Sequence, residues 1–177
     1  LLLKGYPVDV YEAKTVPGGM AATGIPNYRL PKDVLGREIS IIETLGGQIL
    51  YECALGRNLS ISDLFAEGYQ AVFLGVGAHR GKTMGIAGED PTLAGYRFGV
   101  NMLLNINHDY VNQGLDLNLG EKMIVVGGGN VAMDCARSAL RMGVKEVHLL
   151  YRRSRAGMPA DHEEVEAAEK EGVIFHF

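Results

Sequence analysis

The sequence predicts an α/β fold in which short parallel strands alternate with helices. Apolar runs of strand length recur along the chain, and helical patterns of apolar residues separate them. The 24 glycines among 177 residues suit many tight turns between strands and helices. The clearest example of this pattern is a strand, a glycine-rich turn, a helix and a second strand over residues 123–150.

The first part of the chain contains a series of short elements. Residues 1–4 are typical of the end of a helix capped by Gly5, and residues 8–11 alternate as a strand. Beyond them we expect, in order, a turn at 17–20, a helix from Pro31 to Leu45 ended by Gly46 and Gly47, a strand at 48–53, a short helix at 62–67 and a strand at 70–74.

The remainder of the chain begins with an irregular, glycine-rich stretch, residues 79–95, that suits a crossing between two domains. We therefore expect two units, residues 1–78 and 79–177. The second is predicted to contain a helix at 97–107, a loop at 108–120, a strand at 123–126, a helix at 131–140 ended by Gly143, a strand at 144–150, a helix from a capping box of Asp161 and Glu164 to about Lys170, and a strand within 172–177.

The turn after residues 123–126 has the composition of a dinucleotide-binding loop. Gly127 allows a tight turn out of the strand, and Gly129 lets the backbone come close to a pyrophosphate. Ala132 is small enough for the helix to pack closely on the strand. The unpaired N–H groups at the start of the helix would face the phosphates. The alternative is a glycine-rich loop in an ordinary α/β domain.

The end of the next strand indicates which dinucleotide is bound. A site for NAD places an acid there to hold the ribose 2′-hydroxyl, whereas this sequence has Tyr151, Arg152 and Arg153. Guanidinium groups suit a 2′-phosphate, so the sequence predicts an NADP(H) site.

A second nucleotide site is indicated near the N-terminus. Glu12 follows a predicted strand at the place where a Rossmann-like unit puts its ribose-binding carboxylate, although it could be an ordinary strand-end acid. The first strand and glycine loop of that unit are then expected upstream of residue 1. The sequence also stops inside a predicted strand. We therefore expect a Rossmann-like FAD/NAD(P)-binding fold of two units, truncated at both ends.

Composition argues against several other functions. The net charge is −4 without a basic tract, which disfavours nucleic acid, and no apolar run is long enough to span a bilayer. Cys53 and Cys135 suit free thiols in a reducing compartment, which favours a cytoplasmic location. The sequence contains no Cys-x-x-Cys for a dithiol relay, and its five scattered histidines predict no metal site.

Several spaced motifs occur together along the chain. In chain order they are Glu12, Pro17-Gly18-Gly19-Met20, Gly24-Ile25-Pro26-Asn27-Tyr28-Arg29-Leu30-Pro31, Ala71-Val72-Phe73-Leu74-Gly75-Val76-Gly77-Ala78, Gly88-Glu89-Asp90, Gly127-Gly128-Gly129-Asn130-Val131-Ala132-Met133-Asp134, Tyr151-Arg152-Arg153-Ser154-Arg155 and Met158-Pro159-Ala160. Together they resemble a known family, the small (beta) subunit of NADPH-dependent glutamate synthase. The flavin module of dihydropyrimidine dehydrogenase and the large subunit of NADH-dependent ferredoxin:NADP oxidoreductase share the pattern.

This resemblance implies FAD on the first unit and NADPH on the second. Hydride would pass from NADPH to FAD, and electrons would leave through iron–sulfur clusters outside this sequence. No general acid or nucleophile is implied, since aligned cofactor rings carry such a reaction. The implied FAD residues are Glu12, Gly19, Met20, Arg29, Leu55, Gly75 and Gly77; the NADPH residues are Gly127, Gly128, Gly129, Asn130, Val131, Arg152 and Arg153, with Arg155 a weaker candidate.

The resemblance also implies partners and alternatives. The electron acceptor would be a large catalytic subunit or a ferredoxin-type protein. One alternative is a related flavoprotein that transfers electrons to or from ferredoxin, sulfur compounds or a pyrimidine site. Another hypothesis is that the protein is not an enzyme but an NADP-binding sensor or structural subunit. The family's upstream FAD loop, its downstream segment returning to the flavin and its cysteine-rich domain are not in this sequence. The isolated chain is therefore expected to be inactive.

Overall fold

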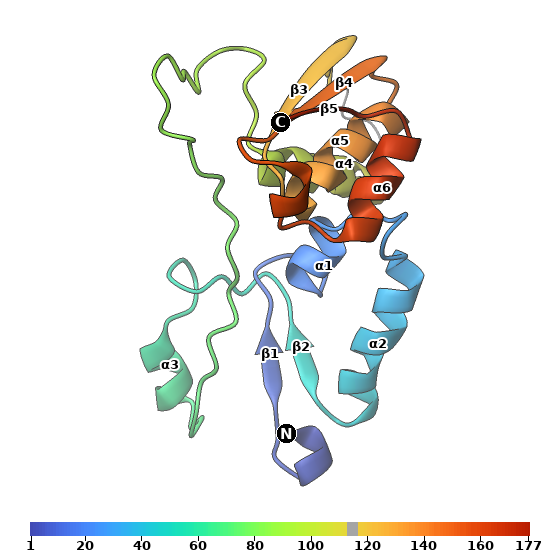
Figure 1. Cartoon of the computed structure of the whole chain (residues 1–177). Coiled ribbons are helices and arrows are strands. Elements are labelled where there is room, and N and C mark those ends of the chain that lie inside the picture. The colour runs from blue at the N-terminus through green and yellow to red at the C-terminus, as the bar shows by residue number, and fades with distance from the viewer. Residues whose placement is uncertain (113–116) are drawn as a thin grey trace. The chain divides into compact units, whose positions relative to one another are not determined.

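The computed structural model describes residues 1–112 and 117–177, and the chain divides into two compact units, Leu1–Ala78 and His79–Phe177. Each unit contains parallel strands and helices (Figure 1), in agreement with the predicted α/β class. The first unit has a two-stranded sheet and the second a three-stranded sheet. The assignment of FAD to the first and NADPH to the second stays a prediction.

Unit 1, Leu1–Ala78, contains η1 (Leu2–Lys4), β1 (Asp9–Tyr11), α1 (Gly19–Thr23), α2 (Lys32–Thr44), β2 (Gln48–Leu50) and α3 (Ile61–Ala66). It is built around the parallel pair β1 and β2, in which Tyr11 lies opposite Leu50. The helix α2 packs on β2 and against the short helix α1.

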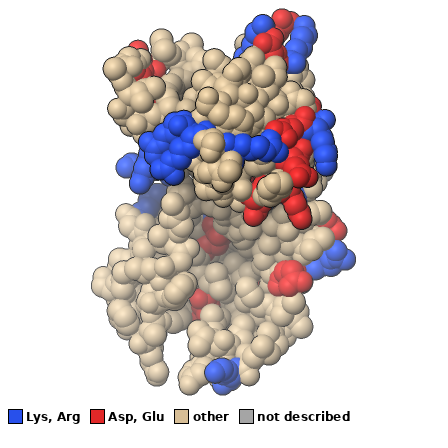
Figure 2. Space-filling model, in the orientation of Figure 1, with Lys and Arg blue, Asp and Glu red and all other residues tan. Residues whose placement is uncertain are grey.

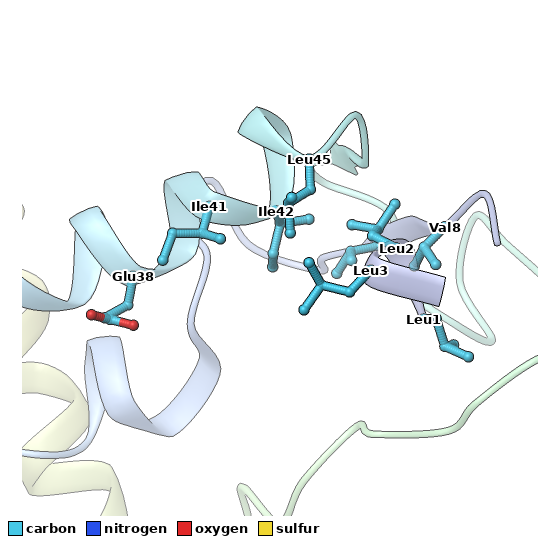
Figure 3. Close-up of a pocket in the computed structure, with 9 residues that line it drawn as sticks. Leu1, Leu2, Leu3, Val8, Glu38, Ile41, Ile42 and Leu45 are labelled. Carbon is cyan, nitrogen blue, oxygen red and sulfur yellow. The ribbon is translucent and has the colours of Figure 1, made fainter. Parts of the chain in front are cut away.

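An apolar hollow lies between η1, β1 and α2 of this unit. Figure 3 shows Leu2 and Leu3 of η1 beside Ile42 of α2 and Leu45, which directly follows α2. Leu3 is 84% exposed, so this apolar face is open to solvent in the described structure. The first unit therefore buries little of its apolar surface.

The segment at 70–74 differs from its prediction as a strand. It forms no strand, and Phe73 is 93% exposed. Its apolar composition suits a strand, but a strand also needs a neighbour to accept and donate its backbone hydrogen bonds. None of the strands in the described part of the chain pairs with it.

Unit 2, His79–Phe177, contains α4 (Gly99–Asn112), β3 (Lys122–Val126), α5 (Asn130–Arg141), β4 (Glu146–Leu150), η2 (Arg155–Gly157), α6 (His162–Lys170) and β5 (Ile174–His176). The backbone of α4 continues five residues beyond the predicted end at Asn107, because residues 100–112 contain no glycine or proline to stop it. The loop predicted at 108–120 is therefore helical in its first part, and residues 113–116 lie outside the described residues.

The sheet of unit 2 is parallel in the order β3-β4-β5, with α4, α5 and α6 on one side of it (Figure 1). Val147 and Leu149 point to the helices and are fully buried, whereas Ile124 on the opposite face is 64% exposed. Alternate residues of a strand point to opposite faces, so the core lies on the helical side alone. No helix among the described residues is long and apolar enough to cross a bilayer.

The end of α5 confirms the predicted role of Gly143. This residue has φ +94°, and its N–H donates to the Leu140 carbonyl at 3.0 Å. The Val144 N–H donates to the Ala139 carbonyl at 3.1 Å, which completes a Schellman motif. The motif turns the chain sharply from α5 towards β4.

The helices α5 and α6 are tied together by largely buried ion pairs. Arg137 of α5 forms ion pairs with Glu164 of α6 and with Glu171, the residue that follows α6. The Arg137 Nη2 and the Arg141 Nη2 each lie 2.7 Å from the Glu171 Oε1. Burial raises the pKa of Glu171, but its hydrogen bonds and charge attraction to Arg137 and Arg141 outweigh burial and lower the pKa overall.

We predict that Glu171→Gln lowers the free energy of unfolding at pH 7 by about 1–3 kcal/mol, since charge-assisted hydrogen bonds are lost. Because the pKa of the Glu171 carboxylate is lowered in the folded state, it stabilises the fold at pH values above the ordinary glutamate pKa of about 4.3. This stabilisation disappears as the pH falls through the folded-state pKa. In urea unfolding, the difference from wild type should therefore be smaller at pH 3 than at pH 7. Glu169→Gln, at an exposed ion pair, is the control.

Candidate functional site

The register of β3 and β4 brings two predicted binding segments to one edge of the sheet. Val126 at the end of β3 lies opposite Leu150 at the end of β4. The strands are parallel, so the segments that follow them leave from the same edge. We call residues 127–131 the glycine loop and residues 152–160 the arginine loop. In open α/β sheets, ligands bind at this carboxyl edge.

Two glycines of the glycine loop are required by the fold, and one is not. Gly127 has φ +145°, which favours glycine, and a Cβ there would come within 3.3 Å of the Ala132 Cβ. A Cβ on Gly128 would come within 2.5 Å of the Tyr151 ring. Gly129 has ordinary extended backbone angles, and its Cβ would meet only the Pro159 Cγ, at 4.0 Å. The open space at Gly129 fits the close approach of a phosphate.

The helix α5 begins at this open space without a side-chain cap. Gly129 is its N-cap residue, and since glycine has no side chain it makes no side-chain cap. Within the described residues, no hydrogen bond is found from the backbone N–H of Asn130 or Val131, which are exposed. Unpaired N–H groups and the positive end of a 12-residue helix form a suitable anion site.

The arginines differ in their partners. Arg155 forms an ion pair with Glu169 of α6, whereas Arg152 and Arg153 are exposed and form none with the residues that the structure describes. Figure 2 shows basic side chains gathered on one part of the visible face, beside acidic ones. An unpaired guanidinium can bind a phosphate without first breaking an ion pair, so Arg152 and Arg153 are better candidates than Arg155.

The arginine loop is held to the glycine loop by contacts that the sequence patterns did not predict. The Ala160 N–H donates to the Gly128 carbonyl at 3.0 Å, and the Asp161 N–H donates to the Asn130 Oδ1 at 2.9 Å. Asp161 was expected to cap α6, but it makes no side-chain cap there. Its carboxylate instead accepts from the Asn130 Nδ2 at 3.4 Å. In the sequence, the Met158-Pro159-Ala160 motif was the one feature that could have indicated this contact between the two loops.

In unit 1, Glu12 lies at the carboxyl edge of the β1–β2 pair. The Glu12 N–H donates to the Leu50 carbonyl, which continues the β1–β2 pairing. The Glu12 carboxylate accepts from the Lys14 N–H at 2.9 Å. Its carbonyl accepts from the Cys53 N–H at 2.9 Å, so the chain towards Leu55 runs beside it. A carboxylate has further acceptor positions beyond this one hydrogen bond, and the ribose role of Glu12 stays a prediction.

The Gly-Gly turn after Glu12 starts α1. Gly18 has φ +104°, and a Cβ there would clash with the Ile39 Cδ1 at 2.9 Å. Gly19 has φ +51° with open space at its Cβ position, which again leaves room for a ligand. The adjacent Met20 packs over Gly24, and Arg29 lies in the turn that precedes α2.

The other predicted FAD residues lie on exposed backbone. Leu55 forms an isolated bridge with Leu59 and is 40% exposed. Gly75 and Gly77 follow the segment at 70–74 and lie outside the helices and strands, and Gly77 has φ +70°. The described structure brings Leu55 towards the Glu12 edge but does not pair the segment of Gly75 and Gly77 with the sheet.

The two cysteines are free thiols, and they lie in different units. Cys135 of α5 is buried, and burial raises the pKa of its thiol to about 12. A thiol with such a pKa is a poor nucleophile at neutral pH, so Cys135 acts as a core residue.

The chain matches the family model of pyridine nucleotide-disulphide oxidoreductases over residues 31–177, and it belongs to this family. The family name refers to disulfide chemistry, whereas this sequence has no Cys-x-x-Cys. The match agrees with the nucleotide-binding fold predicted from the two series of motifs.

Comparison with curated proteins gives relatives along the whole chain. The chain is 51% identical to the beta subunit of NADP(+)-dependent formate dehydrogenase of Moorella thermoacetica, over 98% of this chain and 24% of that protein. It is 46% identical to the beta subunit of NADPH-Fe(3+) oxidoreductase of Geobacter sulfurreducens, over 100% and 26%. It is 35% identical to the glutamate synthase [NADPH] small chain of Halomonas elongata, over 100% and 38%. The last match confirms the resemblance stated above, and the chain spans well under half of each relative.

Solved structures share the fold. FprA of Mycobacterium tuberculosis in complex with NADPH has a TM-score of 0.73 at 23% identity, over 94% of this chain and 41% of that chain. A 2-naphthoyl-CoA reductase has a TM-score of 0.68 at 16% identity, over 99% and 25%. At these identities the likeness shows the fold alone.

Two glycine variants should distinguish the glycine that the fold needs for packing from the glycine that a bound nucleotide needs. Gly128→Ala should lower the free energy of unfolding by about 1–3 kcal/mol, because its Cβ collides with the Tyr151 ring. Gly129→Ala should leave the unfolding midpoint nearly unchanged but weaken NADPH binding about tenfold or more. Thermal unfolding and calorimetric titration measure the two effects. Unchanged NADPH affinity in Gly129→Ala would contradict the close approach.

Proposed function

We propose that this chain is part of an NADPH-dependent flavin oxidoreductase subunit, with NADPH bound on unit 2 and FAD on unit 1. When bound, the two cofactors supply the hydride and electron transfer, and the protein supplies binding and orientation. Electrons leave for iron–sulfur clusters or another acceptor outside this chain. No residue is assigned as a general acid, base or nucleophile.

One arrangement carries the NADPH assignment. The open Gly129, the uncapped start of α5 and the unpaired Arg152 and Arg153 lie at the same edge of one parallel sheet. The backbone N–H groups of Asn130 and Val131 would hold the pyrophosphate, and the two arginines would hold the 2′-phosphate. The name of the formate dehydrogenase relative, which includes NADP(+), supports this choice of nucleotide.

Unit 1 would hold FAD with a smaller set of groups. Glu12 would accept from the adenosine ribose, and Gly19 would admit the cofactor at a position where a side chain is absent. Met20 and Arg29 would line the flavin side, and Leu55 would contribute backbone near the adenine. Gly75 and Gly77 would pass close to the cofactor.

The relatives bear on the final electron acceptor. The beta subunits of formate dehydrogenase and of NADPH-Fe(3+) oxidoreductase are 51% and 46% identical to this chain, against 35% for the glutamate synthase small chain. These values favour a related electron-transfer subunit over a glutamate synthase subunit in the strict sense. A larger partner subunit is proposed in either case.

Replacing both Arg152 and Arg153 with Ala should weaken NADPH binding by about 1.5–3 kcal/mol, through the loss of charge-assisted hydrogen bonds. NADH affinity should change little, because NADH has no 2′-phosphate. Calorimetric titration of both nucleotides gives the comparison.

The control for this double variant is Arg141→Ala, which removes a positive charge at the far end of α5. It should affect NADPH and NADH equally and weakly. An equal loss of both nucleotides in the Arg152 and Arg153 variant would rule out the 2′-phosphate assignment.

A spectral experiment tests the flavin assignment. The intact protein purified with its cofactors should absorb as an oxidised flavoprotein, and NADPH should bleach that absorption without added mediator. Replacing Glu12 with Gln should lower FAD retention, because an amide accepts hydrogen bonds from ribose hydroxyls more weakly than a carboxylate. A colourless protein that binds NADPH would favour the sensor alternative.

A further inference from the structure

We infer that Tyr151 and the Asp161 N–H are positioning groups that clamp the arginine loop to the glycine loop and thereby set the preference for NADPH over NADH. This inference rests on the proposed function, because it concerns how that site recognises the 2′-phosphate. Neither group is assigned to contact the nucleotide.

Tyr151 makes the first attachment. Its ring packs against the backbone of Gly128, where even a Cβ would come within 2.5 Å of the ring. Its hydroxyl donates to the Gly157 carbonyl at 2.8 Å. Gly157 ends η2, so this one side chain spans from the glycine loop to the far side of the turn that contains the arginines.

The second attachment lies at the end of the arginine loop. Ala160 and Asp161 both donate their N–H groups to the glycine loop, to the Gly128 carbonyl and the Asn130 side chain respectively. The Asn130 amide is therefore engaged by the protein. Its contribution to nucleotide binding comes through its backbone N–H, and its side chain holds the loop.

These attachments matter because Arg152 and Arg153 are exposed. Long side chains on a mobile loop lose much of their binding free energy to ordering, whereas a loop held in advance loses less. The nicotinamide and pyrophosphate contacts are common to both nucleotides. Loosening the arginine loop should therefore weaken NADPH alone.

Tyr151→Phe tests the first attachment, because it keeps the ring on Gly128 and removes the hydroxyl bond. We expect the Kd for NADPH to rise about 3- to 10-fold, the effect of one hydrogen bond. The Kd for NADH and the melting temperature should stay the same. Tyr6→Phe, at a 60% exposed tyrosine of unit 1, is the matched control.

Asp161→Pro and Asp161→Ala test the second attachment as a pair. Both remove the carboxylate, but only proline removes the N–H that Asn130 accepts. Asp161 has φ −57°, which suits proline. The ratio of the NADH Kd to the NADPH Kd should fall about 3-fold or more in the proline variant relative to the alanine variant.

The outcomes separate the clamp from the proposed function. A wild-type chain that binds NADPH and NADH equally would overturn the 2′-phosphate site and the clamp together. A wild-type preference for NADPH that survives in both Tyr151→Phe and Asp161→Pro would overturn the clamp alone. Should the proline variant fail to fold, Tyr151→Phe still decides, because equal losses for both nucleotides would mean a merely structural role.

Discussion

The parallel pairing of β3 with β4 is the constraint on which the candidate NADPH site depends. Residue-by-residue pairing from Lys122 to Val126 makes the two strands end together. The glycine loop and the arginine loop therefore leave the sheet side by side, although more than 20 positions of sequence separate them. A slip of one residue would reverse every side chain of β4 between the core and the open face. Val147 and Leu149, fully buried, oppose such a slip.

The two units differ in how firmly they hold their sites. Unit 2 has a continuous core on one face of its sheet, closed by the Arg137 ion pairs between α5 and α6. In unit 1, Leu64 and Pro26 are the buried apolar side chains among the described residues, and Leu3 of η1 remains exposed. A two-stranded sheet supports little structure by itself. The NADPH site is thus the better formed of the two candidates.

The three arginines of the arginine loop differ in whether another side chain of the protein binds them. Arg155 is engaged by Glu169, and the Asn130 amide by Asp161. These groups order the loop. Arg152 and Arg153, which form no ion pair with the described residues, are left for a ligand. Charge alone would have ranked the three arginines together, so their partners decide which of them can bind a phosphate.

The sequence by itself determined the α/β class, the glycine loop, the Gly143 helix end and the arginines in place of an acid, because each depends on local chemistry. Only the tertiary structure decided the partners of Arg155, Asn130 and Tyr151, since these contacts join residues distant in sequence or depend on how the chain folds back. The same reason explains the segment at 70–74: its residues favour a strand, but a strand forms only where a neighbour pairs with it.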